Sequence, residues 1–311
     1  MTPPPAFHQQ RRRRWQRRRE AALTLVFALA ASLAVLVTIG MVASLARGAL
    51  NFFHHVPLTD YLFGLTWQPQ NEQFGLIPLL QGSLLVALTA LILAVPVGVG
   101  AAIFLAEYAS DWQRQRCKPL LELLAGVPTV IYGFFAAVVV APLLHHAGNR
   151  IGVAVSAESA LACGLVVGIM IVPFIASLSD DALCAVPQTW RDASTALGAT
   201  EAETIRRIVL PAALPGLISA CLIGFSKAIG QTMIVLMAGS LSANRTLNPL
   251  EGVSSMTAQI ITLLSGDQAF DSAPTMAAFA LALTLLIIAL LTNSIGVSMN
   301  QRWRARHGNR F

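Results

Sequence analysis

The sequence predicts an all-α, polytopic membrane protein with six transmembrane helices. Of its 311 residues, 55% are hydrophobic and only 12% are charged, whereas soluble domains have about 25% charged residues. Several uncharged stretches exceed the ~20 residues that one helix needs to cross a bilayer. Arginine and lysine are also unevenly divided between alternate loops, which is typical of a membrane topology.

The N-terminal residues 1–20 form a basic arm that contains the arginine runs 11–14 and 17–19. Such an arm could bind nucleic acid or could anchor a membrane span on its cytoplasmic side. The second interpretation is favoured, and no nucleic-acid partner is expected, because the apolar run 21–46 follows directly. This run is longer than the ~7–15 apolar residues of a signal peptide, so we expect it to be a retained first span.

The rest of the chain alternates between apolar runs and polar loops, with proline and glycine inside several runs. We expect a single membrane domain over residues 21–301, a polar loop at 180–211 and a basic tail at 302–311. Residues 47–72, with His54, His55 and Trp67, are expected to be an outer segment with interfacial aromatic residues. After the first span, the predicted spans are 73–106, 123–144, 159–179, 209–244 and 272–301, separated by the loops 107–119, 145–158, 180–211 and 245–271.

Six spans place both termini on one side of the membrane. Arginine and lysine are concentrated in the arm, the loop 107–119, the loop 180–211 and the tail. Only Arg47, Arg150 and Arg245 fall on the other side. The positive-inside rule therefore predicts that both termini and the loop 180–211 are cytoplasmic.

The segment 187–211 is the longest polar interval in the interior of the chain, and it carries its own helix signals. Thr189 with Asp192, and Thr200 with Glu203, have the spacing of capping boxes. Gly198 lies between them, where a left-handed helix stop would be required. We therefore predict two short helices hinged at Gly198, which form an exposed docking element for another protein.

A helix-turn-helix that binds DNA is the alternative interpretation of this segment. It is disfavoured because spans tether the segment at both ends and because its second helix carries only Arg206 and Arg207. Neither of the two lysines, Lys118 and Lys227, lies in a phosphate-binding G-x-x-x-x-G-K-[ST] loop. If the protein uses ATP, another chain binds it. No catalytic constellation, cysteine–histidine metal spacing or cofactor motif is found, so we expect no metal site, cofactor or enzymatic activity.

Lys227 is the one charge near the middle of a predicted span. A cation at that depth costs about 2.5–3.5 kcal/mol on insertion scales and usually faces a bundle interior or an aqueous path. Gly224, Gly230 and Gln231 share its side of the predicted helix. Lys227 is therefore a candidate for guiding an anion, and a purely structural lysine is the alternative.

Thr129 and Tyr132 are the polar groups at depth in the third predicted span. Pro128 is expected to bend this helix and free a carbonyl group. Tyr132 then either lines a translocation path or makes one structural hydrogen bond, and the sequence does not separate these alternatives.

The polar hairpin resembles a loop shared by the permease subunits of ABC importers, of the form E-A-A-x-x-x-G, nine residues, then I-x-L-P. The matching positions in this chain are Asp192, Ala193, Ser194, Gly198, Ile208, Leu210 and Pro211. Asp192 replaces the glutamate and Ser194 replaces the second alanine. The resemblance implies a type I importer permease fold, and coupling helices that lodge in a groove of a separate ATPase subunit.

Two further stretches resemble the phosphate branch of these permeases, the Pst family. Residues 124–133, L-A-G-V-P-T-V-I-Y-G, are similar to its L-A-G-I-P-S-I-V-Y-G run. Residues 227–233, K-A-I-G-Q-T-M, are similar to R-A-L-G-E-T-M, the PstC form. In order along residues 70–300, the three motifs imply that Lys227, Gln231, Thr232, Tyr132 and Thr129 lie on the translocation path.

The resemblance also implies the remaining parts of a phosphate importer in a bacterial inner membrane. These are a second, PstA-like permease, a cytoplasmic ABC ATPase dimer, an extracytoplasmic phosphate-binding protein and the surrounding lipid. Lys227 and Gln231 stand where the family has arginine and glutamate, so the site keeps its positive charge without the bidentate fork of arginine. A permease for another oxyanion (sulfate, molybdate or phosphonate) and an ATP-independent secondary transporter are the alternatives. The hairpin argues against the second of these.

Overall fold

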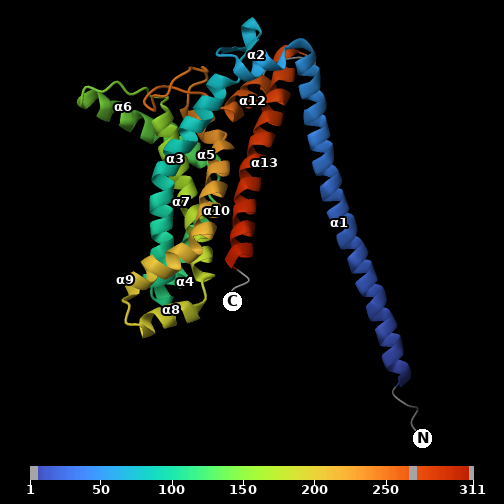
Figure 1. Ribbon diagram of the computed structural model, residues 1–311. Coiled ribbons are helices and arrows are strands. Elements are labelled where there is room, and N and C mark those ends of the chain that lie inside the picture. The colour runs from blue at the N-terminus through green and yellow to red at the C-terminus, as the bar shows by residue number, and fades with distance from the viewer. Residues whose placement is uncertain (1–5, 266–271, 308–311) are drawn as a thin grey trace.

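The computed structural model describes residues 6–265 and 272–307 (Figure 1). As the sequence predicts, six helical segments within these residues are long and apolar enough to cross a membrane. These segments are Leu23–His55, Ile77–Tyr108, Thr129–Arg150, Ala160–Cys184, Glu201–Ile229 and Ala273–Gly296.

Most of the described residues are helical. The longer helices are α1 (Ala6–His55), α3 (Ile77–Ile103), α4 (Asp111–Ala125), α7 (Ala160–Cys184), α10 (Leu210–Ile229) and α13 (Ala273–His307). The shorter helices are α2 (Leu58–Phe63), α5 (Thr129–Phe135), α6 (Ala141–Arg150), α8 (Gln188–Ala196), α9 (Glu201–Thr204), α11 (Met233–Ala238) and α12 (Met256–Leu264). Three single π-helical turns continue or connect these helices. The turn η2 (Phe104–Tyr108) extends α3. The turn η3 (Ala136–Val140) joins α5 to α6, and η4 (Ile205–Val209) joins α9 to α10. The two-residue strands β1 (Trp67–Gln68) and β2 (Gln73–Phe74) pair antiparallel around the short 3₁₀ turn η1 (Pro69–Asn71).

Helices α3 and α7 pack closely at the centre of the bundle because small residues lie between them. A Cβ atom added to Gly164 would approach Thr89 Cβ to 2.6 Å, and one added to Gly168 would approach the carbonyl oxygen of Ala90 to 2.9 Å. Close backbone approach at small residues is how helices gain packing energy in lipid. Helix α10 packs against both α7 and α3 and also contacts α13.

Helix α1 leaves the bundle (Figure 1). It contacts α13 only near its C-terminal end, where Ala49 and Phe52 are buried. Its most apolar window has no buried residue. Residues 6–20, predicted as a separate basic arm, continue the same helix.

The end of the molecule that holds α2 and α12 is closed by an aromatic cluster. Phe52, Tyr61 and Phe74 pack edge to face, and Trp67 packs against Phe74. Trp67 is 5% exposed and donates a hydrogen bond to Gln259 Oε1 at 3.2 Å. The prediction of an interfacial Trp67 is therefore wrong, because its N–H has a partner inside the fold.

The third predicted span begins later than expected. Residues 107–119 were predicted as a loop, but the π-turn η2 is followed by helix α4, whose capping box pairs Ser110 with Gln113. The helix stops at Ala125, and Pro128 caps the start of α5. Proline disfavours helical backbone in the residue before it, so the chain breaks here instead of bending. The span therefore runs over Thr129–Arg150 instead of 123–144.

The fifth predicted span is also displaced. It begins at Glu201, because η4 carries the helix through Pro211 without a break. It ends at Ile229 rather than continuing to residue 244. The backbone N–H groups of Gly230 and Gln231 bond to the Ser226 and Ala228 carbonyls and close the helix with a tighter turn.

The other boundaries differ less. Helix α7 passes the predicted end at residue 179, so Asp180 and Asp181 lie in its last turns. Helix α13 includes the predicted tail as far as His307. Residues 308–311 of that tail and residues 266–271 of the predicted loop 245–271 lie outside the described residues.

Candidate functional site

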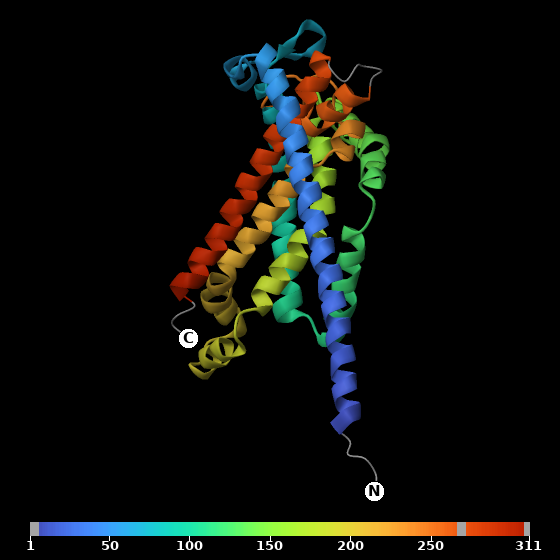
Figure 2. The same cartoon turned by 90° about the vertical axis from the view of Figure 1, so that its right-hand side faces the viewer.

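The polar hairpin projects from one end of the bundle (Figures 1 and 2). Helix α8 is joined by a short turn to α9, which continues through η4 into the fifth span. The beginning of α1 and the end of α13 point to the same end of the molecule, which we call the hairpin end (Figure 1). The two short helices of the sequence prediction are therefore confirmed.

The turn between these helices depends on Gly198. Its φ angle is +85°, in the left-handed region that glycine adopts at helix ends. The N–H of Gly198 bonds to the Thr195 carbonyl at 2.9 Å, and that of Ala199 bonds to the Ser194 carbonyl at 3.2 Å. A Cβ atom at position 198 would meet nothing within 4 Å. The requirement for glycine is therefore one of backbone conformation rather than space.

One of the two predicted helix caps is present. Thr200 and Glu203 form the expected capping box at the start of α9. Thr189 does not cap α8, because that helix begins at Gln188 directly after Pro187, without a side-chain cap. The carboxylate of Asp192 instead accepts a hydrogen bond from Gln188 Nε2 at 3.1 Å. Pro187 is the N-cap residue, with a φ of −55° and a ψ of 136°, so α8 has already begun before Thr189.

Ser194 joins the two helices of the hairpin. Its hydroxyl group is buried and lies 2.8 Å from the hydroxyl of Thr204 on α9. A hydroxyl in an apolar contact is costly unless it is paired, and here each hydroxyl satisfies the other. The serine that replaces alanine in the family pattern is therefore accommodated by a partner that the sequence did not reveal.

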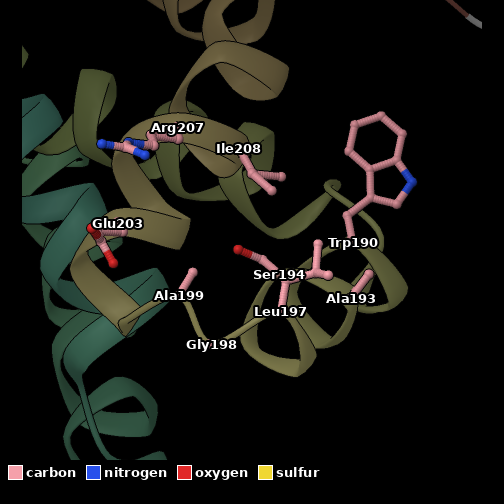
Figure 3. Close-up of a pocket in the computed structure, with 9 residues that line it drawn as sticks. All are labelled: Trp190, Ala193, Ser194, Leu197, Gly198, Ala199, Glu203, Arg207 and Ile208. Atoms are coloured by element: carbon pink, nitrogen blue, oxygen red, sulfur yellow. The ribbon is translucent and has the colours of Figure 1, made fainter.

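A cavity of about 690 Å³ opens between the two arms of the hairpin (Figure 3). Leu197, at the turn, is 89% exposed. This exposed apolar side chain lies beside an open, largely apolar hollow. The cavity is lined by Trp190, Ala193, Ser194, Leu197, Gly198, Ala199, Glu203, Arg207 and Ile208.

Arg191 attaches the hairpin to the bundle. Its guanidinium lies 2.7 Å from Glu107 Oε1 in η2, at the end of the second span. It also donates to the carbonyl oxygens of Leu183 and Val186 at 3.1 and 2.9 Å. Arg191 therefore hydrogen-bonds two backbone carbonyls at the end of α7 and also pairs with the carboxylate of Glu107 in η2.

A second ionic cluster ties α4 to the end of α7. Asp180 is buried, and its carboxylate accepts hydrogen bonds from Arg114 at 2.9 Å and Lys118 at 3.0 Å. Lys118 also donates to Asp181 at 2.8 Å, and these bonds to Asp181 and Asp180 raise the pKa of Lys118 to about 12. Sequence reasoning missed both clusters because their members are far apart in the chain and resemble solvated loop charges.

Lys227 lies in the last turn of α10 and faces α7. Its Nζ atom is 4.5 Å from the centroid of the Phe174 ring. Gly224, one turn earlier in α10, packs against Ile171 and Ile175 of α7. Among the described residues, Lys227 has no carboxylate within ion-pair distance. A positive charge is favoured at the C-terminal end of a helix, so α10 itself stabilises the ammonium group.

Gln231 and Thr232 form the break that follows α10. Gln231 is 7% exposed, and its backbone carbonyl accepts a hydrogen bond from Thr257 of α12 at 2.9 Å. The hydroxyl of Thr232 bonds back to the Gly230 carbonyl at 3.4 Å. Helix α12 thus contacts the break through Thr257, and the sequence analysis missed this contact because it assigned these residues to a loop.

Tyr132 makes a structural hydrogen bond. Its hydroxyl donates to the Leu124 carbonyl at 3.2 Å, across the break at Pro128. Thr129 is the first residue of α5, which packs against α11 through Gly133 and Met233. Within the described part of the chain, no hydrogen bond joins Thr129 or Tyr132 to Lys227. Their place on a path stays a prediction.

Comparison with known proteins gives a consistent result. Residues 94–305 match the family described as "Binding-protein-dependent transport system inner membrane component". The chain is 32% identical over 266 residues to the "Probable ABC transporter permease protein YqgH" of Bacillus subtilis, which covers 85% of this chain and 83% of that one. It is 31% identical over 306 residues to the "Phosphate transport system permease protein PstC" of Mesorhizobium japonicum, covering 90% and 89% of the two chains. It is 32% identical over 288 residues to "PstC 1" of Mycobacterium tuberculosis, covering 83% and 85%.

Solved structures share the fold at much lower identity. A bacterial ABC transporter involved in the import of the acidic polysaccharide alginate superposes with a TM-score of 0.60 and 15% identity, covering 96% of this chain and 99% of that one. The MetNI methionine ABC transporter superposes with a TM-score of 0.52 and 19% identity, covering 73% and 94%.

Proposed function

The chain belongs to the family of binding-protein-dependent transport system inner membrane components, and from this premise we propose that it is the permease subunit of an ATP-driven importer of inorganic phosphate. Relatives over most of its length are named as phosphate permeases. The observation that supports an anionic substrate is the environment of Lys227, a cation inside the bundle. Its partner is an aromatic ring, and among the described residues no carboxylate pairs with it.

The orientation follows from charge. We place the hairpin end in the cytoplasm, because arginine and lysine are concentrated in the segments at that end. The basic arm 1–20, the coupling loop 180–211 and the tail 302–311 then share one side of the membrane. The outer side carries α2 and α12.

At the cytoplasmic side, the hairpin docks on a separate ABC ATPase dimer. Leu197 and the cavity beside it form an apolar contact surface, and Asp192, Ala193, Gly198 and Ile208 shape the two helices that present it. ATP-driven closure of the ATPase pair moves the hairpin as a rigid lever.

The lever acts on the bundle through Arg191. Because Arg191 contacts both η2 and the end of α7, displacement of α8 is transmitted to the second and fourth spans together. Leu210 packs with the buried cluster at this end, and Pro211 lies in the first turn of α10. Movement of the hairpin therefore also turns the fifth span, which carries Lys227.

The translocation path passes Lys227, Gln231 and Thr232, where α10 stops inside the bundle. An oxyanion is attracted by the ammonium group of Lys227 and by the side-chain amide of Gln231 at the break. A second, PstA-like permease supplies the other wall, and an extracytoplasmic phosphate-binding protein delivers the anion. Another oxyanion is the alternative substrate, because lysine provides charge without the bidentate geometry that arginine offers to phosphate.

The test is an uptake assay in bacteria that lack their own phosphate importers and express this chain with its partner subunits. We expect uptake of labelled phosphate that excess sulfate, molybdate or phosphonate does not suppress. Uptake suppressed by one of these anions at equal concentration would reassign the substrate. Uptake that persists when the ATPase carries a substitution of its phosphate-loop lysine would contradict an ATP-driven mechanism.

A further inference from the structure

The contact between Lys227 and Phe174 is the starting point. The two side chains belong to neighbouring helices, α10 and α7, and the ammonium nitrogen lies 4.5 Å from the ring centroid. Both residues are half-buried. A cation within about 6 Å of an aromatic face is attracted by the ring quadrupole, and more strongly where water is excluded.

The position of Phe174 is fixed by the packing around it. Pro173 and Ile175 are buried in the fourth span, and Ile175 contacts Gly224 of α10. The absence of a side chain at Gly224 lets the two helices approach one turn from Lys227. Helix packing therefore fixes the backbone of α7 against α10 at the level where Phe174 and Lys227 meet.

The kind of partner matters for an anion site. A carboxylate at this place would neutralise Lys227, and an incoming anion would have to displace it against a strong attraction in a medium of low dielectric constant. An aromatic ring stabilises the ammonium group but leaves its full positive charge. It is a weaker competitor that an anion can replace.

We propose that Phe174 is an affinity-determining residue of the anion path: its ring holds the Lys227 ammonium group while the path is empty, and an oxyanion binds by drawing that group away. This inference rests on the proposed anion-transport function. It adds a residue of the fourth span to a path that the sequence analysis placed on the third and fifth spans.

Two consequences distinguish this role from simple packing. Weakening the ring's attraction, without changing its shape, should make anions bind more tightly. The gain should also be equal for every oxyanion, because the competing contact is the same whichever anion binds. A packing defect would instead weaken binding or reduce the amount of assembled transporter.

The experiment uses the full transporter, purified with its partner permease and ATPase but without the binding protein. Phenylalanine with one, two or three ring fluorines is incorporated at position 174, because fluorine reduces the negative ring face while nearly keeping its size. Binding of labelled inorganic phosphate and of labelled sulfate is then measured. We expect the phosphate dissociation constant to fall stepwise, to about one third of the starting value at full effect, with an unchanged phosphate-to-sulfate ratio.

Matched controls are available in the chain. The same fluorinated residues at Phe225, a half-buried phenylalanine of α10, should leave phosphate binding unchanged. In a Lys227→Met background, fluorination at position 174 should also have no effect. Phe174→Leu serves as a second variant with no ring, and we expect it to bind phosphate at least as tightly as the most fluorinated form.

The outcomes separate the two proposals. One outcome is a transporter with normal ATP-dependent phosphate uptake whose phosphate binding is absent or is insensitive to fluorination at position 174. That outcome overturns the role of Phe174 and leaves the importer function standing. Failure of the complete transporter to take up phosphate at all counts against the function itself.

Discussion

Arg191 and Lys227 are cations with opposite surroundings. Arg191, at the hairpin end, contacts a carboxylate and two backbone carbonyls within 3.1 Å. Lys227, inside the bundle, faces one aromatic ring and, among the described residues, no carboxylate. The difference separates a charge that holds structure together from one that is available to a ligand. A cation whose hydrogen-bond donors are paired with protein acceptors, such as Arg191, connects the helices that it contacts. A cation without such acceptors, such as Lys227, attracts an anion.

The largest expected effect comes from removing the available charge. In Lys227→Met, we expect phosphate uptake to fall roughly 100-fold, because removing one partner of a desolvated charge contact costs about 2–5 kcal/mol. Uptake is measured in cells, and the assembled complex is quantified by co-purification of its subunits. Lys227→Arg is the control and should retain uptake. Full uptake by the methionine variant would show that the lysine is structural.

Substitution of Arg191 should have a different effect. Arg191→Gln leaves the carboxylate of Glu107, whose side chain is 9% exposed, without its partner. We expect a loss of about 3 kcal/mol in stability, measured as a lower thermal unfolding temperature of the purified complex, together with more ATP hydrolysed per phosphate transported. Unlike Lys227→Met, this variant should keep some phosphate uptake.

Adding a second substitution tests the cause of that loss. In the double variant Arg191→Gln and Glu107→Gln, the buried charge is removed, and part of the stability should return. A double variant that is no more stable than Arg191→Gln alone would contradict the account based on an uncompensated carboxylate.

The hinge of the hairpin should show an intermediate effect. Gly198→Val forces a β-branched residue to a φ of +85°, at a cost of at least about 1–2 kcal/mol. We expect roughly tenfold weaker binding of the ATPase, measured by titrating the purified ATPase onto the permease. Gly198→Asn is the matched control, since asparagine tolerates the left-handed region and its Cβ meets open space in this chain. Equal defects in both variants would indicate that the partner, and not the backbone, excludes a side chain.

The smallest effect is expected inside the hairpin. Ser194→Ala leaves the buried Thr204 hydroxyl without its partner, and should reduce stability by about 1 kcal/mol. Replacing both residues, with Thr204→Val added, should restore much of this loss because no unpaired hydroxyl remains. Thermal unfolding of the complex is the measurement, and a stability unchanged in Ser194→Ala would show that Thr204 finds another acceptor.

Local signals in the sequence were enough to predict six spans and the hairpin, but not the ends of the third and fifth spans. The capping box at Thr200 and the left-handed glycine at position 198 act within one helical turn, so they could be predicted. Thr189 misled because two local signals competed, and Pro187 started the helix first. The same competition at Pro128 decided between a bend and a break in the third span.

The ionic and cation–π contacts described above join residues that are far apart in the sequence. Arg191 with Glu107, Asp180 with Arg114, and Phe174 with Lys227 each depend on which helices become neighbours in the bundle. A single sequence carries no signal for that choice, because any charge on a predicted loop can equally be solvated. The chemistry of Lys227 was therefore predictable, and its partner was not.

The first span has a consequence for assembly. Its apolar window, within Leu23–His55, is not covered by the other described residues. In the two-stage description of membrane protein folding, such a helix is stable alone in the lipid, and its association with other helices is a separate equilibrium. That equilibrium depends on how many partner subunits share the plane of the membrane. We therefore expect this helix to remain open to lipid until the second permease proposed above covers it.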